Sequence, residues 1–270
     1  MTGSIQDEFA KGVITDLRSR SGGMAKSLRA SASPPGSSGP TVGHPDFRDL
    51  EAGASAGCNL AIAFFDMTGF TARTFWQPLA EVTSLAQAVL TQIALVVEAS
   101  GGFVLGLRGD GLMAGWGSRN STSEIDVALC LAACTVSLDA CKEVLNQALV
   151  IDGIEPIQLR AGVDWGLVNF TRTGSTSQSD VNVVGHAANF AAKCEKVALS
   201  WEVVVGEGAA THVDAPLLSA HSGSPKWYQH GNERRSYSFG LFAWFKVLET
   251  SASAIQQVAG RPTSLISASY

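Results

Sequence analysis

Two aspartates, far apart in the chain, lie in settings that suit metal-dependent chemistry. Asp66 ends the apolar run 59–65, and Asp110 lies in the glycine-bracketed turn Arg108-Gly109-Asp110-Gly111. Taken singly, a strand-terminal Asp is often a helix cap, and Asp-Gly is a favoured hairpin turn. Because each aspartate follows an apolar strand, we expect both carboxylates to meet at one sheet edge. There they would bind Mg²⁺ or Mn²⁺ together with substrate phosphates, and a pair of cations would suit phosphoryl chemistry.

The segment that follows Asp66 has the composition of a phosphate-binding turn. It runs from Met67 to Thr71 and leads into a predicted helix. Gly69 lets the backbone approach a phosphate closely, and the N–H groups of Phe70 and Thr71 are expected to bind a triphosphate. The alternative is an ordinary strand-to-helix turn.

A second pair of polar residues lies in a segment of small side chains, 187–193. Asn189 and Lys193 are four positions apart, which places them on one face of a helix. Lys193 is expected to stabilise charge that builds on a phosphoryl group, and Asn189 to orient a ribose or the reacting oxygen. The alternative is a surface lysine and an asparagine of the first helical turn.

Hydrophobic periodicity predicts the elements that position these residues. Strands are predicted at 59–65, 103–107, 112–116, 157–165, 167–170, 181–184, 203–206 and 240–247, and helices at 78–99, 123–148 and 186–198. Two β-α-β units with an inserted hairpin predict an α+β fold of the ferredoxin-like kind.

The ends of the chain differ from its centre. Residues 1–20 are predicted to form an amphipathic helix that packs on its own domain or on a dimer partner, and 21–56 a flexible linker rich in Ser, Gly and Pro. The catalytic domain is expected at 57–250, and 251–270 is expected to be a loose tail.

Composition limits the class of protein. The 270 residues are 46% hydrophobic and 16% charged, with a net charge of -5, which allows a sizeable core and argues against nucleic acid as a partner. The five cysteines form no CxxC pair and are predicted to be buried in a reducing compartment. No signal peptide and no uninterrupted apolar stretch of about 18 residues is evident, so we expect a cytoplasmic protein that does not span a membrane.

Four segments together resemble the signature motifs of class III nucleotidyl cyclases. They are AIAFFDMTGFT (61–71), GGFVLGLRGDGLMAGWG (101–117), LRAGVDWGLV (159–168) and VNVVGHAANFAAKCE (181–195), and the likeness covers 59–247. The resemblance implies a central, mostly antiparallel sheet with flanking helices, in a head-to-tail homodimer with active sites at the subunit interface.

The same resemblance implies roles for individual residues. Asp66, the Met67 carbonyl and Asp110 would bind two divalent cations, Mn²⁺ or Mg²⁺. Asn189 and Lys193 would serve the transition state from the partner subunit.

The chain departs from the family where the base is read. Adenylate cyclases use a Lys four residues before the second metal-binding Asp, where this chain has Gly106, and an Asp seven residues before the Asn, where it has Asn182. The Glu and Cys of guanylate cyclases are absent from both positions. Lys193 stands in place of an Arg, which keeps the charge and loses the bidentate fork. Because a side-chain amide both donates and accepts hydrogen bonds, Asn182 would pair with the edge of uracil. With the amide group flipped, it would pair with the edge of cytosine.

Several further side chains are candidates for the same site. Phe75 and Trp76 would either fill the space that a purine needs or pack in the core at a helix start. Arg108 shares strand parity with Asp110, so we expect it to contact base or phosphate or to pair with a surface carboxylate. Candidate triphosphate clamps are Arg73, Arg234 and Arg235.

These departures resemble the bacterial pyrimidine cyclases of Pycsar anti-phage systems. The resemblance implies conversion of UTP, in preference to CTP, to a cyclic monophosphate and pyrophosphate. The product would be a second messenger for a separate effector with a cyclic-nucleotide-binding domain. The alternatives are an atypical adenylate or guanylate cyclase and a degenerate domain that binds nucleotide as a sensor. A structural dimerisation domain would leave the two aspartates unexplained.

Overall fold

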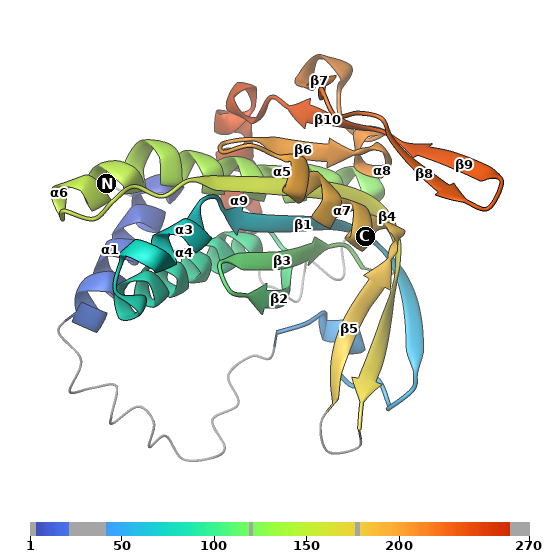
Figure 1. Ribbon diagram of the computed structural model, residues 1–270, viewed down its shortest axis with the longest axis horizontal. Helices are drawn as coiled ribbons and strands as arrows, with labels where there is room; N and C mark the ends of the chain where they lie inside the picture. The colour runs from blue at the N-terminus through green and yellow to red at the C-terminus, as the bar shows by residue number, and fades with distance from the viewer. Residues whose placement is uncertain (1–3, 22–41, 119–120, 176–178, 260–270) are drawn as a thin grey trace.

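The computed structural model describes residues 4–21, 42–118, 121–175 and 179–259 (Figure 1). Its strands are β1 (Ser55–Met67), β2 (Phe103–Arg108), β3 (Gly111–Trp116), β4 (Leu159–Gly174), β5 (Ser179–Gly185), β6 (Val203–Gly206), β7 (Leu218–Ala220), β8 (Lys226–His230), β9 (Glu233–Tyr237) and β10 (Phe239–Phe242). Its helices are α1 (Ile5–Ser21), α3 (Phe70–Trp76), α4 (Leu79–Ala99), α5 (Ser123–Asp139), α6 (Asn146–Ile151), α7 (His186–Val197), α8 (Glu207–Ala210) and α9 (Leu248–Ala259). A π-helical turn, Ala140–Leu145, joins α5 to α6.

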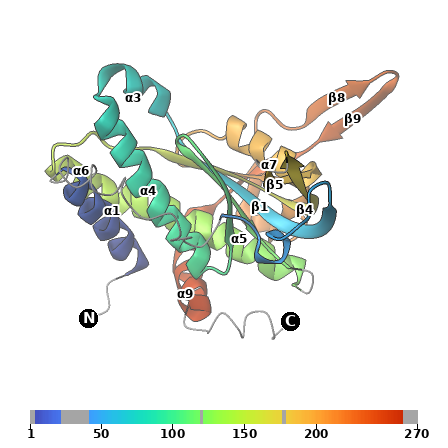
Figure 2. The same ribbon diagram turned by 90° about the horizontal axis from the view of Figure 1, so that it is seen from below.

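The main sheet of the described residues has eight strands. Their order is β2-β3-β1-β4-β6-β10-β7, and β5 pairs with β4 outside this path. The β4–β6 pair is parallel and the other pairs of this sheet are antiparallel. The mixed, mostly antiparallel sheet and its flanking helices confirm the predicted α+β class. The hairpin β8–β9 forms a separate sheet that projects from the body of the fold (Figures 1 and 2).

Alternation along β1 gives the two faces of the sheet different partners. Ala63 and Phe65 join the main core with α1, α4 and α5, whereas Leu60 and Ile62 join a second cluster with the first half of α7. Because side chains alternate along a strand, Asp66 lies on the same face as α7. Figure 2 shows α4 and α7 on opposite sides of the sheet.

Helix α7 lies very close to β4 because both contribute small residues to the contact. A Cβ built on Gly162 would collide with the backbone nitrogen of Glu195 and the carbonyl oxygen of Ala191. Ala187 and Ala188 are buried in the same contact region. The alanines of this segment therefore serve close packing, which fixes α7 relative to β4.

The N-terminal helix packs on its own domain, one of the two outcomes expected. Phe9 and Val13 of α1 are buried in the main core, and α1 contacts α4 and the π-helical turn. The expected linker also contains ordered structure near its end, since Phe47 is buried and stacks on Phe170 at 4.3 Å. Residues 22–41 of that linker lie outside the described residues.

Three other regions differ from the sequence-based expectation. The strands expected at 157–165 and 167–170 are one strand, β4, because Gly166 accommodates a φ of 152° without ending it. The strand expected at 240–247 ends at Phe242, and a 3₁₀ turn follows at Trp244–Lys246. The expected tail begins inside α9, which buries Ile255 in the main core. Residues 260–270 of that tail lie outside the described residues.

Helix α4 is long and apolar because one of its faces is buried in the main core. By length and composition, its 21 residues would be enough to cross a membrane, and half of its most apolar window is buried inside the protein. Val89, Ile93 and Val97 are buried in the main core. Its apolar face therefore covers the sheet face opposite to α7.

Candidate nucleotide and cation site

The fold brings Asp66 and Asp110 together, as the sequence predicts. Asp66 is opposite Gly111 in the β1–β3 pair, and the backbone nitrogen of Met67 donates to the carbonyl oxygen of Asp110 at 3.4 Å. Burial raises the pKa of the Asp110 carboxyl group, and the negative charge of Asp66 raises this pKa further. The two carboxylates therefore share one electrostatic environment.

An arginine and a glutamate complete this cluster. Arg160 lies opposite Asp66 on β4, and its Nη2 atom is 2.7 Å from Asp66 Oδ2 and 2.6 Å from Glu195 Oε1. Burial raises the pKa of Glu195 to about 7, while Arg160 lowers it and Asp66 raises it. Sequence reasoning singled out neither residue, although both lie inside quoted motifs. Their role depends on the strand register and on the packing of α7.

The donor chemistry of the aspartate pair fits a hard divalent cation, which takes oxygen ligands. Arg160 engages Oδ2 of Asp66, and a Cβ built on Gly111 would lie 3.8 Å from Oδ1, so Oδ1 is directed toward the turn that carries Asp110. Within the described ranges, no group of three or more His, Cys, Asp or Glu side chains is arranged to hold a metal ion. The Met67 carbonyl, substrate phosphates and water would therefore have to complete any coordination shell.

The loop after Asp66 has the backbone conformation expected for a close approach. Gly69 has a φ of 76° and immediately precedes α3, and a Cβ built on it would meet no atom within 4 Å. Phe70 is half-buried and Thr71 is exposed. The loop is therefore open to solvent at Gly69 and Thr71.

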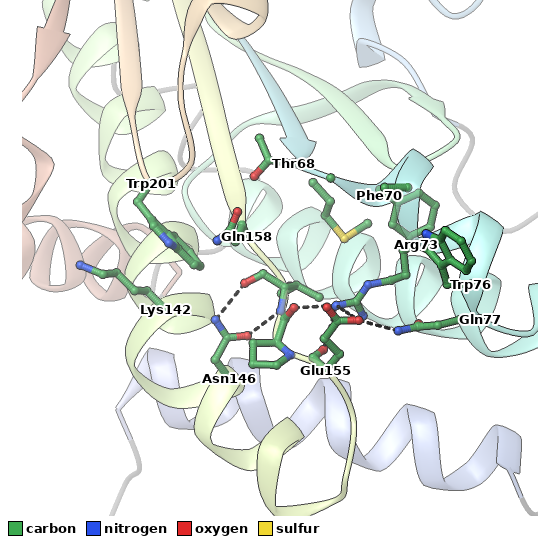
Figure 3. A pocket seen from close by; sticks show the side chains of 15 residues that line it. Thr68, Phe70, Arg73, Trp76, Gln77, Lys142, Asn146, Glu155, Gln158 and Trp201 are labelled. Atoms are coloured by element: carbon green, nitrogen blue, oxygen red, sulfur yellow. Dashed lines mark hydrogen bonds and ion pairs between the residues drawn. The ribbon is translucent and has the colours of Figure 1, made fainter.

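Arg73 faces a different environment from the one expected of a phosphate clamp. It lines a cavity of about 560 Å³ between the β1–α3 loop, α3 and the segment 155–158 that precedes β4 (Figure 3). Its Nη2 atom donates to the carbonyl oxygens of Glu155 and Pro156 at 2.9 and 2.6 Å, and it pairs with the Glu155 carboxylate at 3.8 Å. Protein groups thus occupy one side of this guanidinium group.

The two aromatic residues of α3 are solvent-exposed. Phe75 is 78% exposed and Trp76 is 88% exposed. Core packing, one of the two alternatives expected for them, is therefore wrong. Trp76 lines the cavity described above.

Asn189 and Lys193 lie on the outer face of α7, away from the aspartate pair of the same chain. Both are exposed, whereas Glu195, two positions further along, is buried against Arg160. Lys193 Nζ lies 5.4 Å from the centre of the Tyr228 ring on β8. Helix α7 separates these two side chains from Asp66.

Asn182 lies far from Asp66 within one chain. Asn182 is opposite Thr171 on β4, and Asp66 is opposite Arg160 on the same strand. These partners are eleven positions apart on β4, or about 36 Å along an extended strand. A single subunit therefore does not bring Asn182 to the aspartate pair.

Strand β2 carries the other two candidates for base contact. Gly106 is opposite Met113, and a Cβ built on it would meet no atom within 4 Å. Arg108 is exposed and lies opposite Gly111, which in turn is opposite Asp66. Paired residues share a sheet face, so Arg108 lies on the face of Asp66. Asp110, with which Arg108 was expected to share strand parity, lies instead in the turn between β2 and β3.

Arg234 and Arg235, the other two candidate triphosphate clamps, lie on β9 of the projecting hairpin. The Arg234 guanidinium lies 4.2 Å from the centre of the Trp227 ring, and Arg235 pairs with Glu233 at 3.3 Å. Both arginines are exposed.

Comparison with known proteins relates this geometry to one fold. No family model matches the sequence. An adenylate cyclase of Anabaena cylindrica is 22% identical over 170 residues, which cover 62% of this chain and 33% of that protein. The chain thus spans about a third of that curated relative.

Solved structures give the clearer match. The adenylyl cyclase CyaB of P. aeruginosa has a TM-score of 0.61 and 18% identity, covering 70% of this chain and 95% of that one. The guanylyl cyclase Cya2 has a TM-score of 0.59 and 20% identity, and the match covers 72% of this chain and 94% of that one. The chain therefore has the fold of the class III nucleotidyl cyclases.

Proposed function

We propose that this protein is a class III nucleotidyl cyclase whose reaction depends on two divalent cations bound at Asp66 and Asp110. The observation that carries the proposal is the convergence of these carboxylates at one end of the β1–β3 strand pair, beside an open glycine loop. The Met67 carbonyl would join them as a ligand. When bound, the cations would lower the pKa of the attacking hydroxyl group and neutralise the phosphates.

The proposed reaction is intramolecular. The ribose 3′-oxygen attacks the α-phosphorus, its proton is released, and the bond from that phosphorus to the pyrophosphate oxygen breaks. The chain holds the triphosphate against the loop that contains Gly69, Phe70 and Thr71. Lys193 neutralises charge that develops on the α-phosphoryl oxygens, and Asn189 orients the ribose.

We infer that the active unit is a head-to-tail homodimer. Asn189 and Lys193 project from the face of α7 opposite to the one that contacts Arg160, so they would act on the aspartate pair of a second subunit. The fold similarity to cyclases supports this arrangement. The interface of such a dimer would then hold two sites, each completed by both subunits.

For the substrate we propose UTP, in preference to CTP. The open space at Gly106 and the uncharged amide of Asn182 leave the purine-reading positions without a charge. An amide can match the donor and acceptor pattern of a pyrimidine edge. The product would be a cytoplasmic second messenger of anti-phage defence, read by a separate effector that binds cyclic nucleotides.

The test is incubation of the purified protein with each of the four nucleoside triphosphates and Mn²⁺. Mass spectrometry would identify the product, and pyrophosphate release would give the rate. We expect cyclic UMP as the main product. Cyclic AMP or cyclic GMP as the main product would indicate an atypical purine cyclase, and no pyrophosphate from any nucleotide would indicate a nucleotide sensor.

A further inference from the structure

We propose that Glu195 is a positioning residue that acts through Arg160 to keep one oxygen of the Asp66 carboxylate free for a divalent cation. The inference rests on the proposed function and deepens it. It concerns how the cation affinity of that same site is set.

The ion pair between Arg160 and Asp66 is one-sided. Arg160 Nη2 and Nε lie 2.7 and 2.9 Å from the same oxygen, Oδ2. The other oxygen, Oδ1, is directed toward the Gly111 end of the turn that carries Asp110. One oxygen is thus engaged by the guanidinium, and the other faces the second carboxylate.

Other groups hold the guanidinium in this one-sided position. Nη2 also contacts Glu195 Oε1 at 2.6 Å, and Nη1 donates to the carbonyl oxygen of Ala198 at 3.2 Å. Glu195 is itself only 9% exposed, and α7 is fixed against β4 at Gly162. Glu195 is therefore a rigid partner for Arg160.

Without the Glu195 carboxylate, the geometry of arginine favours a different pairing. Arginine prefers two parallel N–H···O bonds to both oxygens of a carboxylate. Freed on one side, Arg160 would turn to engage Oδ1 of Asp66 as well. That second contact would occupy the oxygen left for the cation and would weaken cation binding.

The test measures Mn²⁺ affinity without nucleotide, from the electron paramagnetic resonance signal of free Mn²⁺. Loss of an outer partner of a metal ligand commonly costs about tenfold or more in affinity, so we expect Glu195→Gln to bind Mn²⁺ roughly tenfold more weakly than wild type. Glu98→Gln, which removes an exposed charge from α4, should bind like wild type. Thermal unfolding checks that each variant is folded.

A double-mutant cycle separates positioning from a structural role. In an Arg160→Gln background, adding Glu195→Gln should cause little further loss. Equal loss in both backgrounds, or wild-type affinity in Glu195→Gln, would overturn the inference. Should Glu195→Gln not fold, Glu195→Asp keeps the charge with a shorter reach and should also weaken binding, and wild-type affinity there would overturn the inference equally.

The same assay distinguishes failure of this inference from failure of the proposed function. If Asp66→Asn binds Mn²⁺ like wild type, the cation assignment itself is wrong, and the role of Glu195 fails with it. If Asp66→Asn loses binding and Glu195→Gln does not, only the role of Glu195 is wrong.

Discussion

At the scale of single residues, Lys193 is the charge assigned to the transition state. It is exposed, and a cation–π contact to Tyr228 is its described interaction. We predict that Lys193→Ala lowers the turnover number by about 100-fold with little change in KM, because the charge it neutralises develops only during the reaction.

The measurement is steady-state pyrophosphate release, with Lys196→Ala as the matched control on the same helix, where Lys196 is also exposed. A Lys193→Ala variant that loses affinity for substrate at an unchanged turnover number would show that the residue only binds.

Local sequence was enough to find the aspartates and insufficient to find their partners. Asp66 and Asp110 each follow an apolar run and lie within three residues of a glycine, a pattern visible in a short window. The Asp66–Arg160 pair joins residues 94 positions apart, and Glu195 reaches it only because Gly162 admits α7 so closely. Neither the strand register nor the distance between α7 and β4 can be read from a local sequence pattern.

At the scale of elements, the contact of α7 with β4 positions the Arg160 cluster. Because a Cβ at residue 162 would collide with the α7 backbone, we predict that Gly162→Ala destabilises the fold by about 1–3 kcal/mol. Chemical denaturation measures this change. Gly106→Ala is the control for stability, since its added Cβ meets open space. An equal effect of both substitutions would contradict the close contact.

A buried carboxyl group at the start of α5 makes stability depend on pH. Asp126 is 6% exposed and accepts a hydrogen bond from the Ser121 hydroxyl at 2.8 Å, and burial raises its pKa from 3.8 to about 6. Because the folded-state pKa is the higher one, this group's contribution to stability is lost as pH rises from about 4 to about 6. The loss is of the order of 3 kcal/mol.

We therefore predict that Asp126→Asn removes this part of the pH dependence. From pH 4 to pH 8, the unfolding free energy of the wild type should fall by roughly 3 kcal/mol relative to that of the variant. The exposed Asp214→Asn serves as control. A difference between wild type and Asp126→Asn that is constant over this range would contradict the assignment.

The elements found from sequence are rich in apolar residues that the fold buries. Helix α4 and strands β1 and β3 are examples. The hairpin β8–β9 was not predicted because nine of its ten residues are exposed, so it lacks the alternation that marks a half-buried strand. Tyr237, the buried residue of the hairpin, donates a hydrogen bond from its hydroxyl group to the buried Asp164 of the main sheet at 2.9 Å.

At the scale of the whole molecule, each proposed site needs residues from two subunits. We predict that Asp66→Asn and Lys193→Ala, each nearly inactive alone, restore activity when their subunits are mixed. Random pairing gives mixed dimers one intact site each, so the activity should reach roughly a quarter of the wild-type value. Mixing after dissociation and reassociation, followed by a pyrophosphate assay, measures it. An unchanged sum of the two low activities would exclude a shared site.

The most direct test of the account is the Mn²⁺ dependence of cyclic nucleotide formation by Asp66→Asn and Asp110→Asn, measured by mass spectrometry beside wild type. We predict that wild type forms product as Mn²⁺ is added and that both variants form essentially none at any Mn²⁺ concentration. Near-wild-type product formation by either folded variant would contradict the assignment of these two carboxylates.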